Sequence, residues 1–97
     1  MTQLFDLVSQ RRAIIERRHL SDALLALEGN DAAKLRNASV ALLRPALEAG
    51  RAEIARRLAA KPNQGRETAA SYAFLTDQIL RLIFDFTLQR LYPLNNP

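Results

Sequence analysis

The chain has 97 residues, a formal net charge of +4 at pH 7 and 48% hydrophobic residues. This length supports one small hydrophobic core, and the low glycine and proline content excludes a collagen-like or disordered chain. Because cysteine is absent, a disulfide framework and thiolate metal sites are excluded, which fits a reducing cytoplasm. Abundant alanine, leucine, arginine and glutamate favour an all-α fold.

The first expected helix runs from a cap at Ser9 to about Glu28. Ser21-Asp22 is a second candidate cap, which would divide this helix. Neither glycine nor proline precedes that pair, so a continuous helix is the preferred prediction. Its apolar side is formed by Ile14 or Ile15, Leu20, Leu24 and Leu27.

The second expected helix begins at Asn30 or Asp31, after the Gly29-Asn30 break, and extends to about Lys61. Pro45 lies inside it and predicts a kink or a break, because proline lacks a backbone donor and clashes with the carbonyl four residues earlier. Gly50 falls on the inner stripe and predicts close approach by a neighbouring helix. The inner side comprises Leu35, Leu42, Leu43, Leu47, Ile54 and Leu58.

The third expected helix runs from about Arg66 to Tyr92, which completes a three-helix antiparallel bundle. At 100° per residue, its apolar side chains fall into two stripes. The stripe assigned to the core comprises Tyr72, Leu75, Ile79, Leu82, Ile83 and Phe86. The second stripe comprises Leu80, Phe84, Leu88 and Leu91.

One apolar stripe is enough to close a three-helix core, so the second stripe predicts an interface with another protein surface. Asp77 borders this stripe. Its expected role is either structural, as the partner of Arg81 four residues later, or that of a polar anchor at the interface.

A pI of about 10.3 raises the question of nucleic-acid binding. Five pairs of opposite charge, however, are spaced four apart, as on the solvated face of a helix, and no aromatic side chains are interleaved to stack on bases. Nucleic acid is therefore not an expected partner. The expected pairs are Arg12–Glu16, Arg44–Glu48, Glu53–Arg57, Asp77–Arg81 and Arg81–Asp85.

Catalytic, cofactor-binding and metal-binding residues are not expected in this chain. His19 is the only histidine and is best interpreted as a surface residue. Asp77 and Asp85 are eight residues apart on one helix, too far to share a proton. The most apolar window, residues 75–91, carries four charged residues, which argues against a membrane span.

Three segments carry a family resemblance. They are Ala49-Gly-Arg-Ala-Glu-Ile-Ala-Arg-Arg-Leu, Pro62-Asn-Gln-Gly and Tyr72-Ala-Phe-Leu-Thr-Asp-Gln-Ile-Leu-Arg-Leu-Ile-Phe-Asp-Phe. Together they resemble the amino-terminal helical region of the bacterial bifunctional [protein-PII] uridylyltransferase/uridylyl-removing enzyme. The resemblance covers the whole chain, but its motifs are apolar helical patterns rather than a catalytic signature.

The resemblance implies that residues 1–97 are one helical module, with nucleotidyltransferase, hydrolase and regulatory domains after Pro97. The parent would transfer a uridylyl group from UTP to a PII signalling protein with magnesium assisting, and a separate hydrolase domain would remove it. Its glycine-rich turn and Asp-x-Asp are not in this chain. The module itself is therefore expected to be an inactive cytoplasmic scaffold, docked on the catalytic domain.

An alternative interpretation is a freestanding helical module that dimerises or binds a partner helix. It would use the second stripe of the third helix for that contact. Self-association of the 97-residue chain is compatible with both interpretations.

Overall fold

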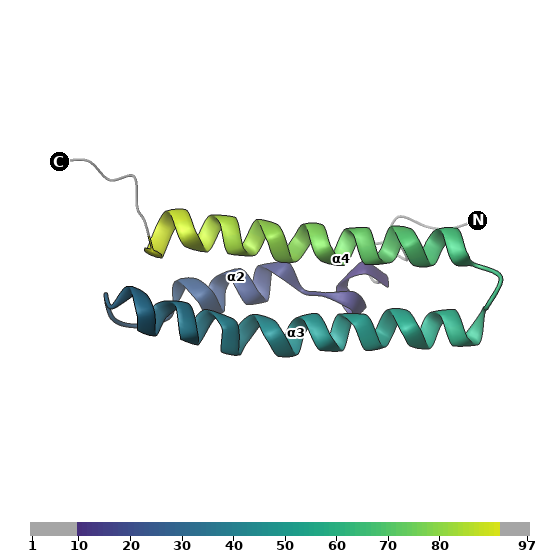
Figure 1. The fold of residues 1–97 in the computed structure, drawn as a ribbon, viewed down its shortest axis with the longest axis horizontal. Helices are drawn as coiled ribbons and strands as arrows, with labels where there is room; N and C mark the ends of the chain where they lie inside the picture. Colours follow the sequence, from purple (N-terminus) through teal and green to yellow (C-terminus); the bar gives the residue numbers. More distant parts are fainter. Residues whose placement is uncertain (1–9, 92–97) are drawn as a thin grey trace.

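The computed structural model describes residues 10–91, in which all regular structure is helical and no strand occurs. The all-α class is therefore confirmed. α3 lies along both α2 and α4 and runs in the opposite direction to them (Figure 1). The elements are a helical stretch at residues 10–14, α2 (Arg17–Leu25), α3 (Ala32–Ala60), α4 (Gly65–Phe86) and a π-helical turn, η1 (Thr87–Leu91).

The prediction of one continuous first helix is wrong, because residues 15 and 16 interrupt it. Ile14 and Ile15 are both buried, with 5% and 7% of their surface exposed. Successive residues of an α-helix point about 100° apart, so an unbroken helix would direct one of the two away from a narrow core. The interruption places both isoleucines inside. Residues 10–91 therefore contain four helical pieces before η1, where three helices were expected.

The ends of the elements follow from local chemistry. Asp31 caps α3, as its carboxylate accepts hydrogen bonds from the backbone amides of Ala33 at 2.9 Å and Lys34 at 3.3 Å. Gly29 has φ +96°, a conformation that glycine adopts without strain, which confirms the expected break before α3. α2 is not divided at Ser21, and the proposed cap at Ser9 lies outside the described residues.

α3 continues through Pro45 without a break. Proline leaves the carbonyl of Ala41 without its usual helical donor, but Ala41 and Pro45 both lie on the exposed side of the helix. Water can therefore satisfy that carbonyl, and the helix need not end. A kink at this point stays a prediction.

Gly50 confirms the expected close approach between helices. A Cβ atom at this position would lie 2.8 Å from Cδ1 of Leu75 on α4 and 2.9 Å from the backbone oxygen of Ile14. Only a residue without a side chain fits between these groups. Around this contact the core consists of Ile14, Ile15, Leu20, Leu24, Leu35, Leu43, Ile54, Leu75, Ile79, Leu82 and Phe86.

Candidate interaction surface

The outer side of α4 carries three large exposed apolar residues. They are Leu80, Ile83 and Phe84, with 59%, 45% and 63% of their surface exposed, and we call them the α4 apolar surface. A shallow depression beside them extends to Arg17 of α2. On the opposite side of the same helix Leu75, Ile79, Leu82 and Phe86 are buried. Leu80 and Phe84 were expected to be accessible, whereas their role as an interface stays a prediction.

Two residues assigned to the core stripe are instead exposed, namely Ile83 and Tyr72, the latter at 38%. Ile83 lies about 100° around the helix from the buried Leu82, which puts it beyond the arc that the neighbouring helices cover. Tyr72 lies at the edge of the packed side, about 60° around the helix from the buried Leu75. The buried arc of α4 is therefore narrower than its apolar stripe.

Leu88 and Leu91 do not continue the exposed stripe, because both are half-buried and Leu91 packs against the core. The cause is the π-helical turn. A π turn closes its hydrogen bond at i+5 instead of i+4 and so contains one additional residue. Each later side chain is consequently rotated by about 100° relative to an uninterrupted α-helix, and Leu91 moves from the exposed side towards the core.

Arg90 links this π turn to the end of α2. Its guanidinium group donates hydrogen bonds to four backbone oxygens, at distances from 2.5 to 3.4 Å. The last carbonyls of a helix have no partner within the helix, so Arg90 caps α2 from a position more than 60 residues later in the chain. The acceptors belong to Leu24, Leu25, Leu27 and Gly29.

Asp77 is exposed and accepts a hydrogen bond from Nε of Arg81 at 2.8 Å. This is the expected pair at i and i+4, so the geometry of Asp77 agrees with its structural role. Both side chains are more than half exposed, and such a pair contributes little to stability. The role of Asp77 as an anchor stays a prediction. Arg81 and Asp85 do not form the other expected pair in the described part of the chain.

The strongest charge cluster lies on α3, away from the α4 apolar surface. Glu53 accepts hydrogen bonds from Arg56 and Arg57, which lower the pKa of its carboxyl group from 4.5 to about 2. Arg57 also donates to the backbone oxygen of Gln10 at 2.7 Å. This cluster therefore fastens residues 10–14 to α3, and it includes the expected Glu53–Arg57 pair. The Arg12–Glu16 and Arg44–Glu48 pairs are not formed among residues 10–91.

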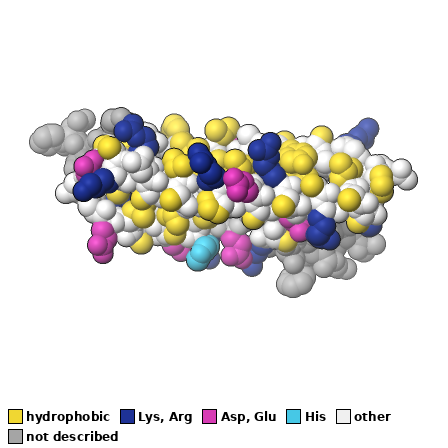
Figure 2. Space-filling model, turned by 60° about the horizontal axis from the view of Figure 1, so that its bottom comes forward, with side chains coloured by type: hydrophobic (Ala, Val, Ile, Leu, Met, Phe, Trp, Pro, Cys, Tyr) yellow, Lys and Arg dark blue, Asp and Glu magenta, His cyan; other side chains and the backbone are white. Residues whose placement is uncertain are grey.

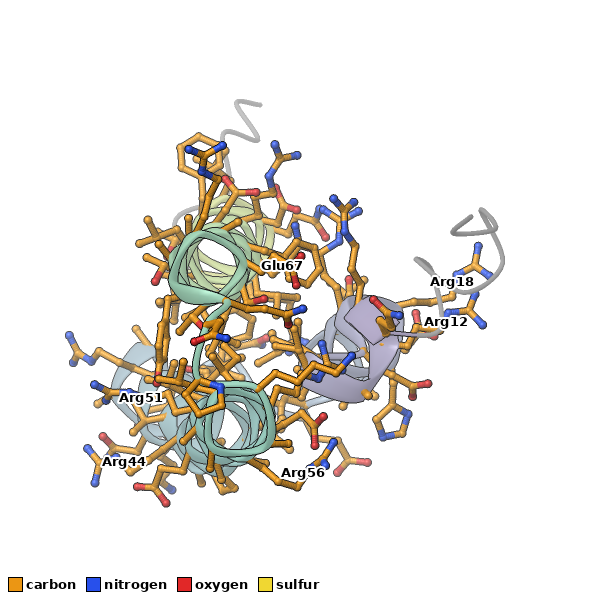
Figure 3. All side chains as sticks on the ribbon, turned by 90° about the vertical axis from the view of Figure 1, so that its right-hand side faces the viewer. Arg12, Arg18, Arg44, Arg51, Arg56 and Glu67 are labelled. Atoms are coloured by element: carbon orange, nitrogen blue, oxygen red, sulfur yellow. The ribbon has the colours of Figure 1, made fainter. Side chains whose placement is uncertain are left out.

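The remaining charges are dispersed. Figure 2 shows basic side chains scattered singly among hydrophobic ones over the face it displays. In Figure 3, Arg12 and Arg18 project from one side of the molecule, while Arg44 and Arg51 project from another. His19 is exposed on α2, as expected. On the faces that these figures display, the described residues offer no concentrated basic groove for a phosphate backbone.

Within residues 10–91, no three His, Asp or Glu side chains come together in a group that could hold a metal ion. None of the helices described is both long and apolar enough to cross a membrane. The α4 apolar surface is therefore the candidate site with the clearest physical basis, because exposed contiguous apolar side chains favour contact with another surface.

The chain is similar to curated proteins named "Bifunctional uridylyltransferase/uridylyl-removing enzyme". It is 45% identical over 89 residues to that of Novosphingobium aromaticivorans, 44% over 89 residues to that of Erythrobacter litoralis and 40% over 91 residues to that of Rhodospirillum rubrum. Each alignment covers 92% of this chain but 10% of the relative. No family model and no solved structure matches the chain. The predicted resemblance is confirmed, and the chain is a homologue of one segment of the bifunctional uridylyltransferase/uridylyl-removing enzyme family.

Proposed function

We propose that this chain is the amino-terminal helical scaffold of an enzyme that uridylylates and deuridylylates PII signalling proteins. The observation that carries the proposal is 45% identity spread over 92% of the chain, with a relative whose name contains both activities. The chain spans about a tenth of the length of the relatives it matches. The parent's substrates would be UTP with magnesium and a PII protein, and its location the cytoplasm.

The scaffold would act by docking the outer side of α4 on the parent's catalytic domain. Leu80, Ile83 and Phe84 supply the exposed apolar area, while the buried side of α4 fixes the helix on α2 and α3. A large exposed apolar side chain gains free energy when it is removed from water, at about 25 cal/mol per Å². Leu88 and Asp77 would lie at the edges of the contact, and Leu91 would support it from the core side.

Nucleic acid and membranes are not part of the proposed function. The dispersed arginines and the Glu53 cluster leave no continuous basic surface on the faces that Figures 2 and 3 display. The proposal therefore requires only protein contacts from this chain, and chemistry from the remainder of the parent.

A chimeric enzyme tests the proposal. The matching segment of the Novosphingobium aromaticivorans enzyme is replaced by this chain, and mass spectrometry follows uridylylation of a PII protein with UTP and magnesium. We expect the chimera to be active, and Phe84→Ser to lower its activity. Val40→Ser is the matched control, because Val40 is also a large exposed apolar residue, at 44%, but lies on α3.

Two outcomes would contradict the scaffold. One is a chimera that folds but has no activity. The other is a chimera in which Phe84→Ser and Val40→Ser have the same small effect. If the 97-residue chain also forms a stable dimer that Phe84→Ser abolishes, the freestanding dimerisation module becomes the better interpretation.

A further inference from the structure

The π turn at Thr87–Leu91 is stabilised by contacts outside its own hydrogen bonds. π-helices have poorer geometry than α-helices and occur mostly as single turns at functional positions. Here two groups offset that cost. Arg90 donates to carbonyls at the end of α2, and Leu91 packs against the core. Both interactions depend on the rotation that the additional residue of the π turn produces.

An uninterrupted α-helix over the same residues would lose both contacts. Counting 100° per residue from Phe86, Arg90 would turn away from α2 by about 100°, and Leu91 would join Phe84 and Leu80 on the outer side. The apolar spacing in the sequence, at 80, 84, 88 and 91, matches this α-helical register. The structure shows the π register. The α-helical arrangement suggested by the spacing would therefore differ from the observed one in where Arg90 and Leu91 lie.

We infer that η1 is a register switch held in its π form by Arg90, and that its α-helical form extends the α4 apolar surface by Leu88 and Leu91. In the π form the surface ends at Phe84 and the end of α2 is capped. In the α form the surface is two turns longer and the α2 cap is released. The effect of the switch on docking rests on the proposed function. The register change does not, and it can be tested with the 97-residue chain alone.

The direct test is Arg90→Met, which keeps a long apolar stem and removes every donor. NMR couplings across backbone hydrogen bonds distinguish the two registers, since they connect residues i and i+5 in a π turn and i and i+4 in an α-helix. In the unmodified chain we expect i+5 couplings at the π turn, for example between residues 86 and 91. In Arg90→Met we expect these to be replaced by i+4 couplings.

A single thiol gives an independent readout, because the chain contains no cysteine. Leu91→Cys should react slowly with a maleimide when Arg90 is present and about tenfold faster or more with Arg90→Met, since a hydrogen bond to a charged donor is worth at least that factor. Phe84→Cys, at a position already 63% exposed, should react rapidly in both backgrounds.

Deletion of Gln89 separates a register change from simple fraying. Gln89 is exposed, and removing one residue converts the π turn to an α turn while Arg90 and Leu91 keep their present directions. In this shortened chain, Arg90→Met should not accelerate labelling of Leu91→Cys. Equal acceleration in both backgrounds would mean that the end of α4 only frays, and the inference would be wrong.

Two other outcomes would also overturn the inference. If Arg90→Met retains the i+5 couplings and the slow labelling, Arg90 does not select the register. If circular dichroism shows instead that Arg90→Met unfolds the chain, Arg90 is required for folding and does not select between two registers.

Discussion

Gly50 offers a quantitative test of the packing, because two opposing effects of Gly50→Ala can be compared. Alanine is better than glycine in a helix interior by about 1 kcal/mol. Against this gain, the new Cβ would lie 2.8 Å from Cδ1 of Leu75 and 2.9 Å from the oxygen of Ile14. The Leu75 methyl group can rotate away, but the backbone oxygen cannot do so without moving the chain at the interruption before α2.

Overpacking of this kind costs about 1–3 kcal/mol, and the fixed oxygen puts Gly50→Ala near the upper end. We therefore expect a net loss of about 2 kcal/mol in the free energy of unfolding, or a fall of about 10 °C in Tm for a domain of this size. Gly65→Ala is the matched control, since no atom lies within 4 Å of its added Cβ, and it should be neutral or slightly stabilising. Urea denaturation followed by circular dichroism measures both. If Gly50→Ala is as stable as Gly65→Ala, the close approach at Gly50 is wrong.

Three further predictions concern stability and activity. Leu82→Ala should lower the free energy of unfolding by about 2–5 kcal/mol because Leu82 is buried, whereas Phe84→Ala should change it by less than about 1 kcal/mol. Urea denaturation measures both, and equal losses would contradict a helix with one buried and one exposed side. The pKa of Glu53 is lowered to about 2, so its contribution to stability is complete above pH 4.5 and is lost as the pH falls towards 2. Glu53→Gln should accordingly reduce the loss of stability between those pH values, as measured by thermal melts. Incubation of the chain with UTP, magnesium and a PII protein should leave the mass of the PII protein unchanged, and a gain of one uridylyl group from pure chain would refute its expected inactivity.

The features that could be predicted from the sequence are those determined by neighbouring residues. The carboxylate of Asp31 captures two amides within three residues, so the start of α3 is visible as a sequence pattern. Gly50 lies between leucines and Ile54 on one stripe of α3, where the absence of a side chain predicts close approach by a neighbouring helix. The pair of Asp77 and Arg81 follows likewise from their spacing.

The features that were missed depend on contacts between distant residues. The interruption at Ile15 is compensated by burial of Ile14 and Ile15 in the core and by the bond from Arg57 to Gln10, 47 residues apart. The π turn is compensated by Arg90, whose acceptors lie 61 to 66 residues earlier. A helical wheel assumes a constant angle per residue, so it cannot detect one additional residue in a turn and misplaces Leu91.

The same reasoning explains why the candidate surface was only partly predicted. A stripe of apolar residues at 80, 84, 88 and 91 is correct for an α-helix, and it fails where the helix changes register after Phe86. Ile83 was assigned to the core because the wheel does not show how wide an arc the neighbours cover. The candidate surface therefore shifts from the end of the stripe towards Leu80, Ile83 and Phe84.

The two sides of α4 have different roles within the same short segment. Leu82 and Phe86 fix the helix in the core, while Leu80 and Phe84, each two residues before one of these, remain open to a partner. Because the buried side is anchored to both neighbouring helices, the exposed side is presented in a fixed orientation, which lowers the entropic cost of docking. Arg90 adds to this rigidity by joining the end of α4 to the end of α2. In the proposed function, the chain would influence the parent enzyme by holding the α4 apolar surface at a defined place and angle.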